Sequence, residues 1–110
     1  MSYEQLVCAR KQCRRCSGEL INPGDWCDEV GPWTRWLGSQ PAKVILVGQD
    51  WGTVGYFQKH NGRDISDNLT NKRLTEFLLL LGFHVLPASG TDGQSGVFAT
   101  NAILCLSDRA

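Results

Sequence analysis

The pattern of apolar and polar positions changes near residue 42. The segment "AKVILVG", residues 42–48, is a continuous apolar run, which is typical of a strand covered on both faces in an α/β sheet. Residues 53–68 are polar and rich in Gly, Asn and Asp, so we expect a loop there. The segment "VFATNAILCL", residues 97–106, predicts a second buried strand, which polar Thr100 and Asn101 interrupt in the middle.

One helix is predicted between these strands. Four apolar side chains follow the i, i+3, i+4, i+7 spacing of a helical face: Leu74, Phe77, Leu78 and Leu81. Asn68 or Thr70 can cap its start, and Gly82 stands where a C-terminal glycine belongs. "FHVLP", residues 83–87, predicts a short strand, and residues 88–96 a turn-rich loop. This order predicts an α/β fold with a mainly parallel sheet.

The 110 residues are expected to form one domain, with an irregular, cysteine-rich layer over residues 1–40 and an α/β core over 41–110. Three tryptophans are expected to dock this layer on the core by packing: Trp26, Trp33 and Trp36. Because a buried strand ends near Leu106, we expect the chain to be the N-terminal part of a larger fold. A partner chain or self-association would otherwise cover the open sheet edge.

Composition narrows the class of protein. The formal net charge is zero, so whole-chain charge predicts no nucleic-acid partner, and any such contact must come from a local patch. The longest apolar run, residues 77–81, is far shorter than a membrane span. The N-terminus has no secretory pattern, so we expect a cytoplasmic protein with no membrane contact.

Polar side chains stand at the ends of both predicted strands. Ligands of open parallel sheets bind beyond the carboxyl ends of the strands, where Gln49 and Asp50 follow one strand and Asn101 interrupts the other. An amide suits the edge of a nucleobase, and a carboxylate can orient a water molecule. The alternative is that Gln49 and Asp50 only cap a turn or helix.

The five cysteines suggest a metal site. Cys13 and Cys16 form a CxxC pair whose thiolates can reach one metal, and Cys105 lies far along the chain. One CxxC with a remote cysteine suits an iron–sulfur cluster better than a zinc ribbon, because no second CxxC exists. Zinc and unligated buried thiols remain alternatives, and packing is the favoured role for Cys8 and Cys27.

Several motifs together resemble the uracil-DNA glycosylase superfamily, especially its iron–sulfur-containing (family 4-like) branch. The matching segments, in order along the chain, are the CxxC at 13–16, "VGQDWG", "NGRD", "LLLLGF" and "VFATNAILC". The resemblance spans about residues 8 to 106. It implies a three-layer α/β/α fold that is incomplete in this chain, and a [4Fe–4S] cluster on Cys13, Cys16 and Cys105. The fourth ligand and a leaving-group-stabilising histidine would lie beyond Ala110.

The resemblance also implies roles for individual residues. "GQDWG" is similar to the GQDPY motif of cluster-free relatives, so Asp50 would position the hydrolytic water. The implied uracil-binding residues are Gly48, Gln49, Trp51, Tyr56 and Asn101. Gly52 stands where those relatives place a tyrosine that excludes thymine. Ile65 stands where the iron–sulfur branch has a stacking aromatic residue, so Tyr56 or Phe57 would stack instead.

The expected function is therefore hydrolysis of the N-glycosidic bond of uracil in DNA, in base excision repair. We expect little activity from this chain alone, because the histidine is outside it. Candidate phosphate contacts are Arg14, Arg15, Lys59 and Arg63. Neither His60 nor His84 is expected to be catalytic. The alternative is a non-catalytic metal- or cluster-binding α/β module that binds nucleic acid or a partner protein.

Overall fold

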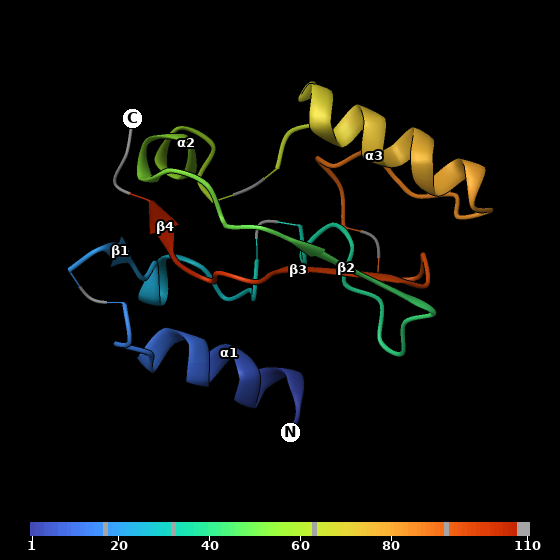
Figure 1. Cartoon of the computed structure of the whole chain (residues 1–110). Coiled ribbons are helices and arrows are strands. Elements are labelled where there is room, and N and C mark those ends of the chain that lie inside the picture. The colour runs from blue at the N-terminus through green and yellow to red at the C-terminus, as the bar shows by residue number, and fades with distance from the viewer. Residues whose placement is uncertain (17, 32, 63, 92, 108–110) are drawn as a thin grey trace.

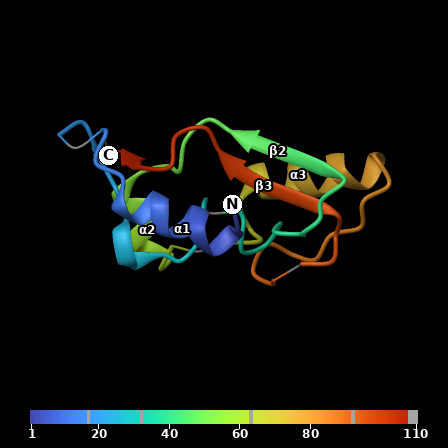
Figure 2. The same cartoon turned by 90° about the horizontal axis from the view of Figure 1, so that it is seen from below.

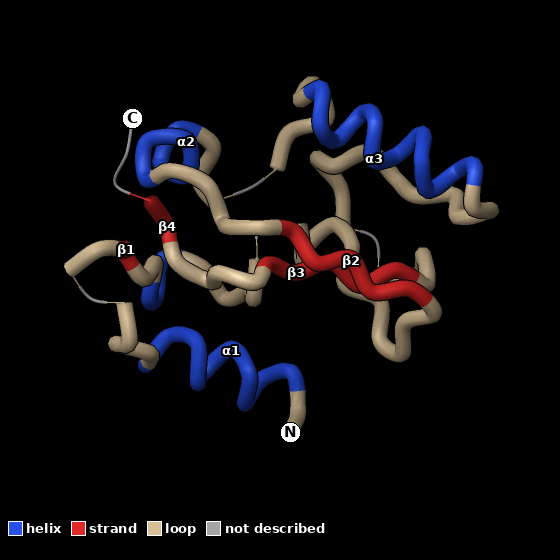
Figure 3. Tube along the Cα trace, in the orientation of Figure 1, coloured by secondary structure: helices blue, strands red, loops and turns tan. Residues whose placement is uncertain are grey.

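The structure is a computed structural model that describes residues 1–16, 18–31, 33–62, 64–91 and 93–107. Figures 1 and 3 show its elements. In chain order they are α1 (Tyr3–Gln12), β1 (Leu20–Ile21), the 3-10 helix η1 (Gly24–Trp26), β2 (Val44–Gly48), α2 (Val54–Lys59), α3 (Leu69–Leu80), β3 (Val97–Asn101) and β4 (Leu106–Ser107).

A parallel strand pair lies at the centre of the molecule. β2 and β3 pair in parallel, from Val44 opposite Val97 to Gly48 opposite Asn101, and β1 pairs with β4 in a small antiparallel sheet. α3 lies on one side of the parallel pair and α1 on the other (Figures 1 and 2). The expected mixed α/β architecture with parallel strands is therefore confirmed.

The prediction that both faces of β2 are covered is wrong. Leu46 packs against the main core, whereas Ile45 is 65% exposed and Val47 is 63% exposed. In β3 the residues facing the core, Val97 and Ala99, are fully buried. α1 lies toward one end of the strand pair rather than over β2, so it leaves the outer face of β2 open (Figure 2).

α3 confirms the predicted helix and half of its predicted apolar face. Asn68 is the N-cap, and its side chain accepts hydrogen bonds from the backbone N–H groups of residues 70 and 71. Leu78 is fully buried and Leu74 packs against the same core, but Phe77 and Leu81 are each about half exposed. Gly82 follows with a φ of 89°, a backbone conformation that is strained for residues that carry a side chain.

Two helices lie where irregular chain was expected. α1 begins with a capping box, in which the Ser2 side chain and the Gln5 side chain each bond the other's backbone N–H. Only two of its residues are buried, Val7 and Arg10, so it has no apolar stripe for periodicity to detect. α2 lies inside the predicted loop 53–68 and begins at a Thr53 cap.

Two predicted strands also differ from the structure. Residues 83–87 form no strand, although Phe83 and Val85 do pack against the core. The long strand predicted over 97–106 ends at Asn101, where the chain bends, and the backbone N–H groups of Ala102 and Ile103 donate to the backbone oxygens of Gly48 and Gln49. The chain re-enters a strand only at β4.

The tryptophans of the N-terminal layer divide between core and surface. Trp36 is buried and Trp33 packs against the main core, as expected, whereas Trp26 is mostly exposed beside the ring of Phe57. Within the described part of the chain, no helix has the length and apolar character needed to cross a membrane.

Candidate functional site

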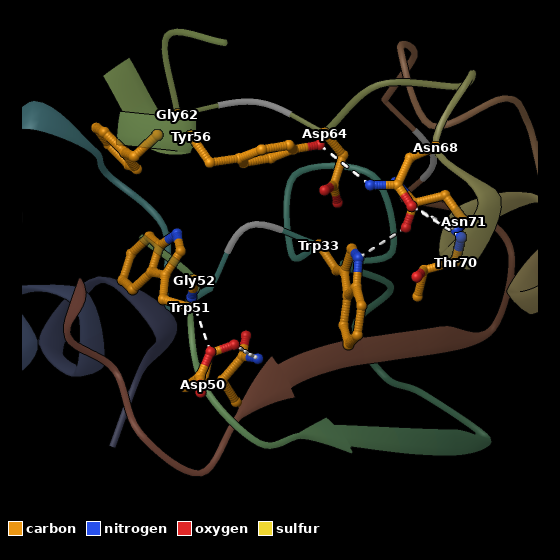
Figure 4. Close-up of a pocket in the computed structure, with 12 residues that line it drawn as sticks. Trp33, Asp50, Trp51, Gly52, Tyr56, Gly62, Asp64, Asn68, Thr70 and Asn71 are labelled. Atoms are coloured by element: carbon orange, nitrogen blue, oxygen red, sulfur yellow. Dashed lines mark hydrogen bonds between the residues drawn. The ribbon is translucent and has the colours of Figure 1, made fainter. Parts of the chain in front are cut away.

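A pocket of about 180 Å³ opens beyond the carboxyl ends of β2 and β3 (Figure 4). Its lining comes from the loop after β2 and from α2, from the start of α3, from the end of β3 and from the N-terminal layer. The lining residues are Trp33, Asp50, Trp51, Gly52, Tyr56, Phe57, Gly62, Asp64, Asn68, Thr70, Asn71 and Asn101. The parallel pairing thus brings Asp50 and Asn101 to one place, as expected from their positions at the strand ends.

Asn101 and Asp50 are joined by a hydrogen bond. The buried Asn101 side chain donates from Nδ2 to the backbone oxygen of Asp50 at 2.5 Å, which leaves its Oδ1 buried with no partner. The Asp50 carboxylate is exposed, and its Oδ1 accepts from the backbone N–H of Gly52 at 2.9 Å. The turn-capping interpretation of Asp50 is therefore confirmed for one oxygen, and the other remains available to a ligand.

Gly48 fits closely beneath this amide. A Cβ atom at Gly48 would lie 2.7 Å from Asn101 Nδ2 and 2.7 Å from the ring of Trp33. The lack of a side chain at Gly48 therefore lets Asn101 and Trp33 pack closely against the backbone, although Gly48 itself does not line the pocket. The side chain of Gln49 is exposed and is not among the residues that line the pocket.

Aromatic rings form much of the pocket wall. Trp51 and Phe57 are buried and meet edge to face with ring centroids 6.2 Å apart. The Tyr56 hydroxyl accepts from Asn68 Nδ2 at 3.2 Å. Behind the wall, the guanidinium carbon of buried Arg10 lies 5.2 Å from the Trp51 ring centroid, a cation–π distance. Planar apolar walls with a few polar groups suit a flat heterocycle.

Sequence reasoning missed Asp64 and the side chains that hold it. Burial raises the pKa of the Asp64 carboxyl to about 7, against an opposing hydrogen bond from Asn71. Its Oδ2 is buried with no hydrogen-bond partner. Asn71 is itself buried; it accepts from Trp33 Nε1 at 3.0 Å and donates to the Ile65 backbone oxygen at 3.1 Å. The only signal in the sequence was a carboxylate two residues after Gly62, in "NGRDIS".

The three cysteines proposed as ligands line a second pocket. Cys13, Cys16 and Cys105 surround a cavity of about 200 Å³, although Cys105 is remote in sequence. Burial raises the pKa of the Cys105 thiol, and the nearby sulfurs of Cys16 and Cys13 raise it further. Across the described ranges, no three His, Cys, Asp or Glu side chains are arranged so that they could hold a metal ion. The thiols are gathered but not in ligating geometry.

The remaining described cysteines and candidate charges do not line the first pocket. Cys8 is exposed, and Cys27 packs partly buried against the cluster that contains Trp51. The exposed candidates for phosphate contact are Arg14, Arg15 and Lys59, whereas Arg63 lies outside the described residues. His84 is exposed, and the centroids of the His60 and Tyr56 rings lie 4.4 Å apart. Neither histidine lines the pocket.

Comparison of the chain with protein-family models, with curated proteins and with solved structures gives no match.

Proposed function

We propose that the chain carries the base-binding pocket of a uracil-DNA glycosylase-like enzyme. The observation that supports this most is the meeting of Asp50 and Asn101, from positions 51 residues apart, in one aromatic-walled pocket. An unpartnered amide oxygen, a carboxylate and flat apolar walls are what a flipped-out base and an attacking water require. The finer three-layer glycosylase-like fold and the cytoplasmic location belong to the same proposal.

The reaction follows from these positions. Uracil, flipped out of DNA, lies between the aromatic walls, and Asn101 Oδ1 accepts its ring N–H. The C1′–N1 bond breaks and its electron pair leaves with the base, while the Asp50 carboxylate stabilises the positive charge that develops on the sugar. A water molecule held by the free Asp50 oxygen then attacks C1′ and gives its proton to that carboxylate.

The role of Asp50 is tested by Asp50→Asn. Asparagine keeps an oxygen for the Gly52 N–H but cannot take the proton of water. We therefore expect the low rate of uracil release from single-stranded DNA, measured with the chain in large excess over the DNA, to fall by at least about a further 100-fold. DNA affinity should change less than about twofold. The measurement is single-turnover uracil release beside fluorescence-anisotropy binding.

Asp25→Asn is the matched control, because Asp25 is an exposed carboxylate that faces Lys11 and lies outside the pocket. It should leave the rate of release unchanged. Equal losses of rate and affinity in Asp50→Asn would contradict the water-positioning role.

The second pocket supports a cluster or metal as part of this proposal. Cys13, Cys16 and Cys105 supply the soft thiolate donors that iron–sulfur clusters and zinc prefer, and a bound group there would tie β4 to the N-terminal layer. Its chemistry would be structural, since the pocket with Asp50 has a separate lining.

Cysteine substitution tests this second pocket. Anaerobically purified protein is expected to contain iron and sulfide and to absorb visible light. Cys105→Ser should abolish both, whereas Cys8→Ser should not, because exposed Cys8 is not in the pocket. A colourless protein with one zinc per chain and no uracil release would instead favour a non-catalytic metal-binding module, the second function that the gathered thiols support.

A further inference from the structure

The outer side of α3 exposes apolar side chains. Asn71 and Leu78 are the buried residues of this helix, and no other described element lies against its opposite side (Figure 1). On that side Leu69 is 63% exposed and Leu80 is 86% exposed, and Phe77 beside them is 52% exposed. The water-facing side of a surface helix is normally polar. This side of α3 is therefore a candidate contact surface.

The outermost row of α3 combines two of these apolar side chains with two charges. A helix turns by about 100° per residue, so four exposed residues fall within about 60° of one another, opposite the buried side. In chain order they are Leu69, Arg73, Glu76 and Leu80. The row thus reads apolar, basic, acidic, apolar. Read from the other end, it has the same apolar ends with the two charges exchanged.

This outer row is complementary to a second copy of itself. When a second α3 lies antiparallel across a two-fold axis midway along the row, Leu69 faces Leu80 of the second copy, and Arg73 faces its Glu76. The match holds because the members of each pair are equally far from the midpoint between residues 74 and 75. A two-fold axis repeats each contact, so one interface contains two leucine pairs and two ion pairs.

The two charges are available for such pairs. Arg73 and Glu76 are exposed, and neither forms an ion pair within the described part of the chain, whereas neighbouring Lys72 is paired with Asp67. A purely apolar partner would cover both charges and leave them unpaired, and a partner of one charge sign would repel one of them. A second copy avoids both penalties, so the charges favour it as the occupant.

We propose that the outer row of α3 is the contact surface of an antiparallel homodimer. The helix has 12 residues and is about 18 Å long, so a pair of such helices buries less than the roughly 800 Å² per partner of a standard interface. The dimer is accordingly weak: we expect the chain to be monomeric at about 1 µM and largely dimeric at about 500 µM. This dimer is independent of the function proposed for the two pockets.

Sedimentation velocity across this range of concentrations tests the dimer. Glu76→Arg and Arg73→Glu each bring like charges face to face, so each should raise the dimer dissociation constant at least about tenfold. Mixing the two variants in equal amounts restores opposite charges at both ion pairs, and the mixture should dimerise as the parent chain does. Glu19→Arg makes the same change of charge at an exposed carboxylate outside α3, and it should leave the dimer unchanged.

A second measurement uses the unaltered chain and covers the event that the variants fail to fold. Backbone amide NMR signals along the outer row should shift between dilute and concentrated protein, whereas those of Ile45 and Val47 on the open face of β2 should not. A parent chain that stays monomeric at about 500 µM would overturn the inference and leave the row to a different protein. Folded single variants that dimerise like the parent, a mixture that fails to recover the dimer, or signal shifts on β2 instead of α3 would each overturn it as well.

Discussion

Asn101 links the fold and the pocket within a single side chain. It ends β3, its Nδ2 ties β3 to the backbone after β2, and its Oδ1 stays buried without a partner. Leaving such an acceptor unsatisfied costs about 1–3 kcal/mol. A ligand N–H that reaches this oxygen recovers that free energy. Asn101 is therefore expected to favour a ligand that offers a hydrogen-bond donor.

Gly48 is predicted to be required for this arrangement. In Gly48→Ala the new methyl group would meet Asn101 and the Trp33 ring at once, so we expect the free energy of unfolding to fall by about 1–3 kcal/mol. Urea denaturation measures this, and base binding should weaken with it. Gly55→Ala is the control, because a Cβ there meets nothing within 4 Å and alanine suits a helix better; it should be neutral or stabilising.

Among the residues of the first pocket, the sequence predicted those that the pairing of β2 with β3 brings together. Asp50 and Asn101 stand at strand ends, and parallel strands bring such ends to the same edge. Asp64 was missed because its character comes from burial against Asn71 and Trp33, which no local pattern encodes. Gln49 is adjacent to Asp50 in sequence, but successive residues point in different directions, and its side chain lies outside the pocket.

Among the elements, α3 was the easiest to predict because it has a capping residue, an apolar stripe and a terminal glycine together. α1 and α2 were missed because each depends on a cap and one or two buried contacts rather than on a repeating stripe. Residues 83–87 have the composition of a strand but pack as an irregular segment. A strand needs a hydrogen-bonded partner, and composition does not reveal one.

Two leucines of α3 test which side of the helix holds the fold together. Leu78 is fully buried, so Leu78→Ala should lower the free energy of unfolding by about 2–5 kcal/mol. Leu80 makes the matched control, since it is 86% exposed in the same helix; Leu80→Ala should change stability by less than about 0.5 kcal/mol. Similar losses from both, in thermal or urea unfolding, would mean that the exposed side of α3 is covered.

On the scale of the whole molecule, two apolar clusters meet at the first pocket. The main cluster lies between the strand pair and α3 and includes Trp36 and Leu78, while the smaller one contains Trp51, Phe57 and Leu106. Arg10 of α1 spans from the Trp51 ring to the backbone oxygens of Gly24 and Cys27. The N-terminal layer is thereby attached to the pocket wall.

The stability of the whole chain is predicted to depend on pH through Asp64. The pKa of Asp64 is raised from 3.8 to about 7 on folding, so between these values the folded chain binds a proton that the unfolded chain has released. The Asp64 contribution therefore falls as pH rises through this range, by about 1 kcal/mol per pH unit. Asp64→Asn should remove that part of the slope in urea denaturation, and Asp67→Asn should not. An equal slope in parent and Asp64→Asn would contradict the raised pKa.

The parallel pairing of β2 with β3 has a consequence for the order of folding. Residues 44–48 meet residues 97–101, so more than fifty residues of chain must be closed into a loop before a single ladder hydrogen bond forms. Contacts of such long sequence separation form slowly, whereas α3 needs only local ones. Asp50 and Asn101 can therefore meet only when this slow step is complete. The pocket is assembled late in folding and is lost whenever the two strands separate.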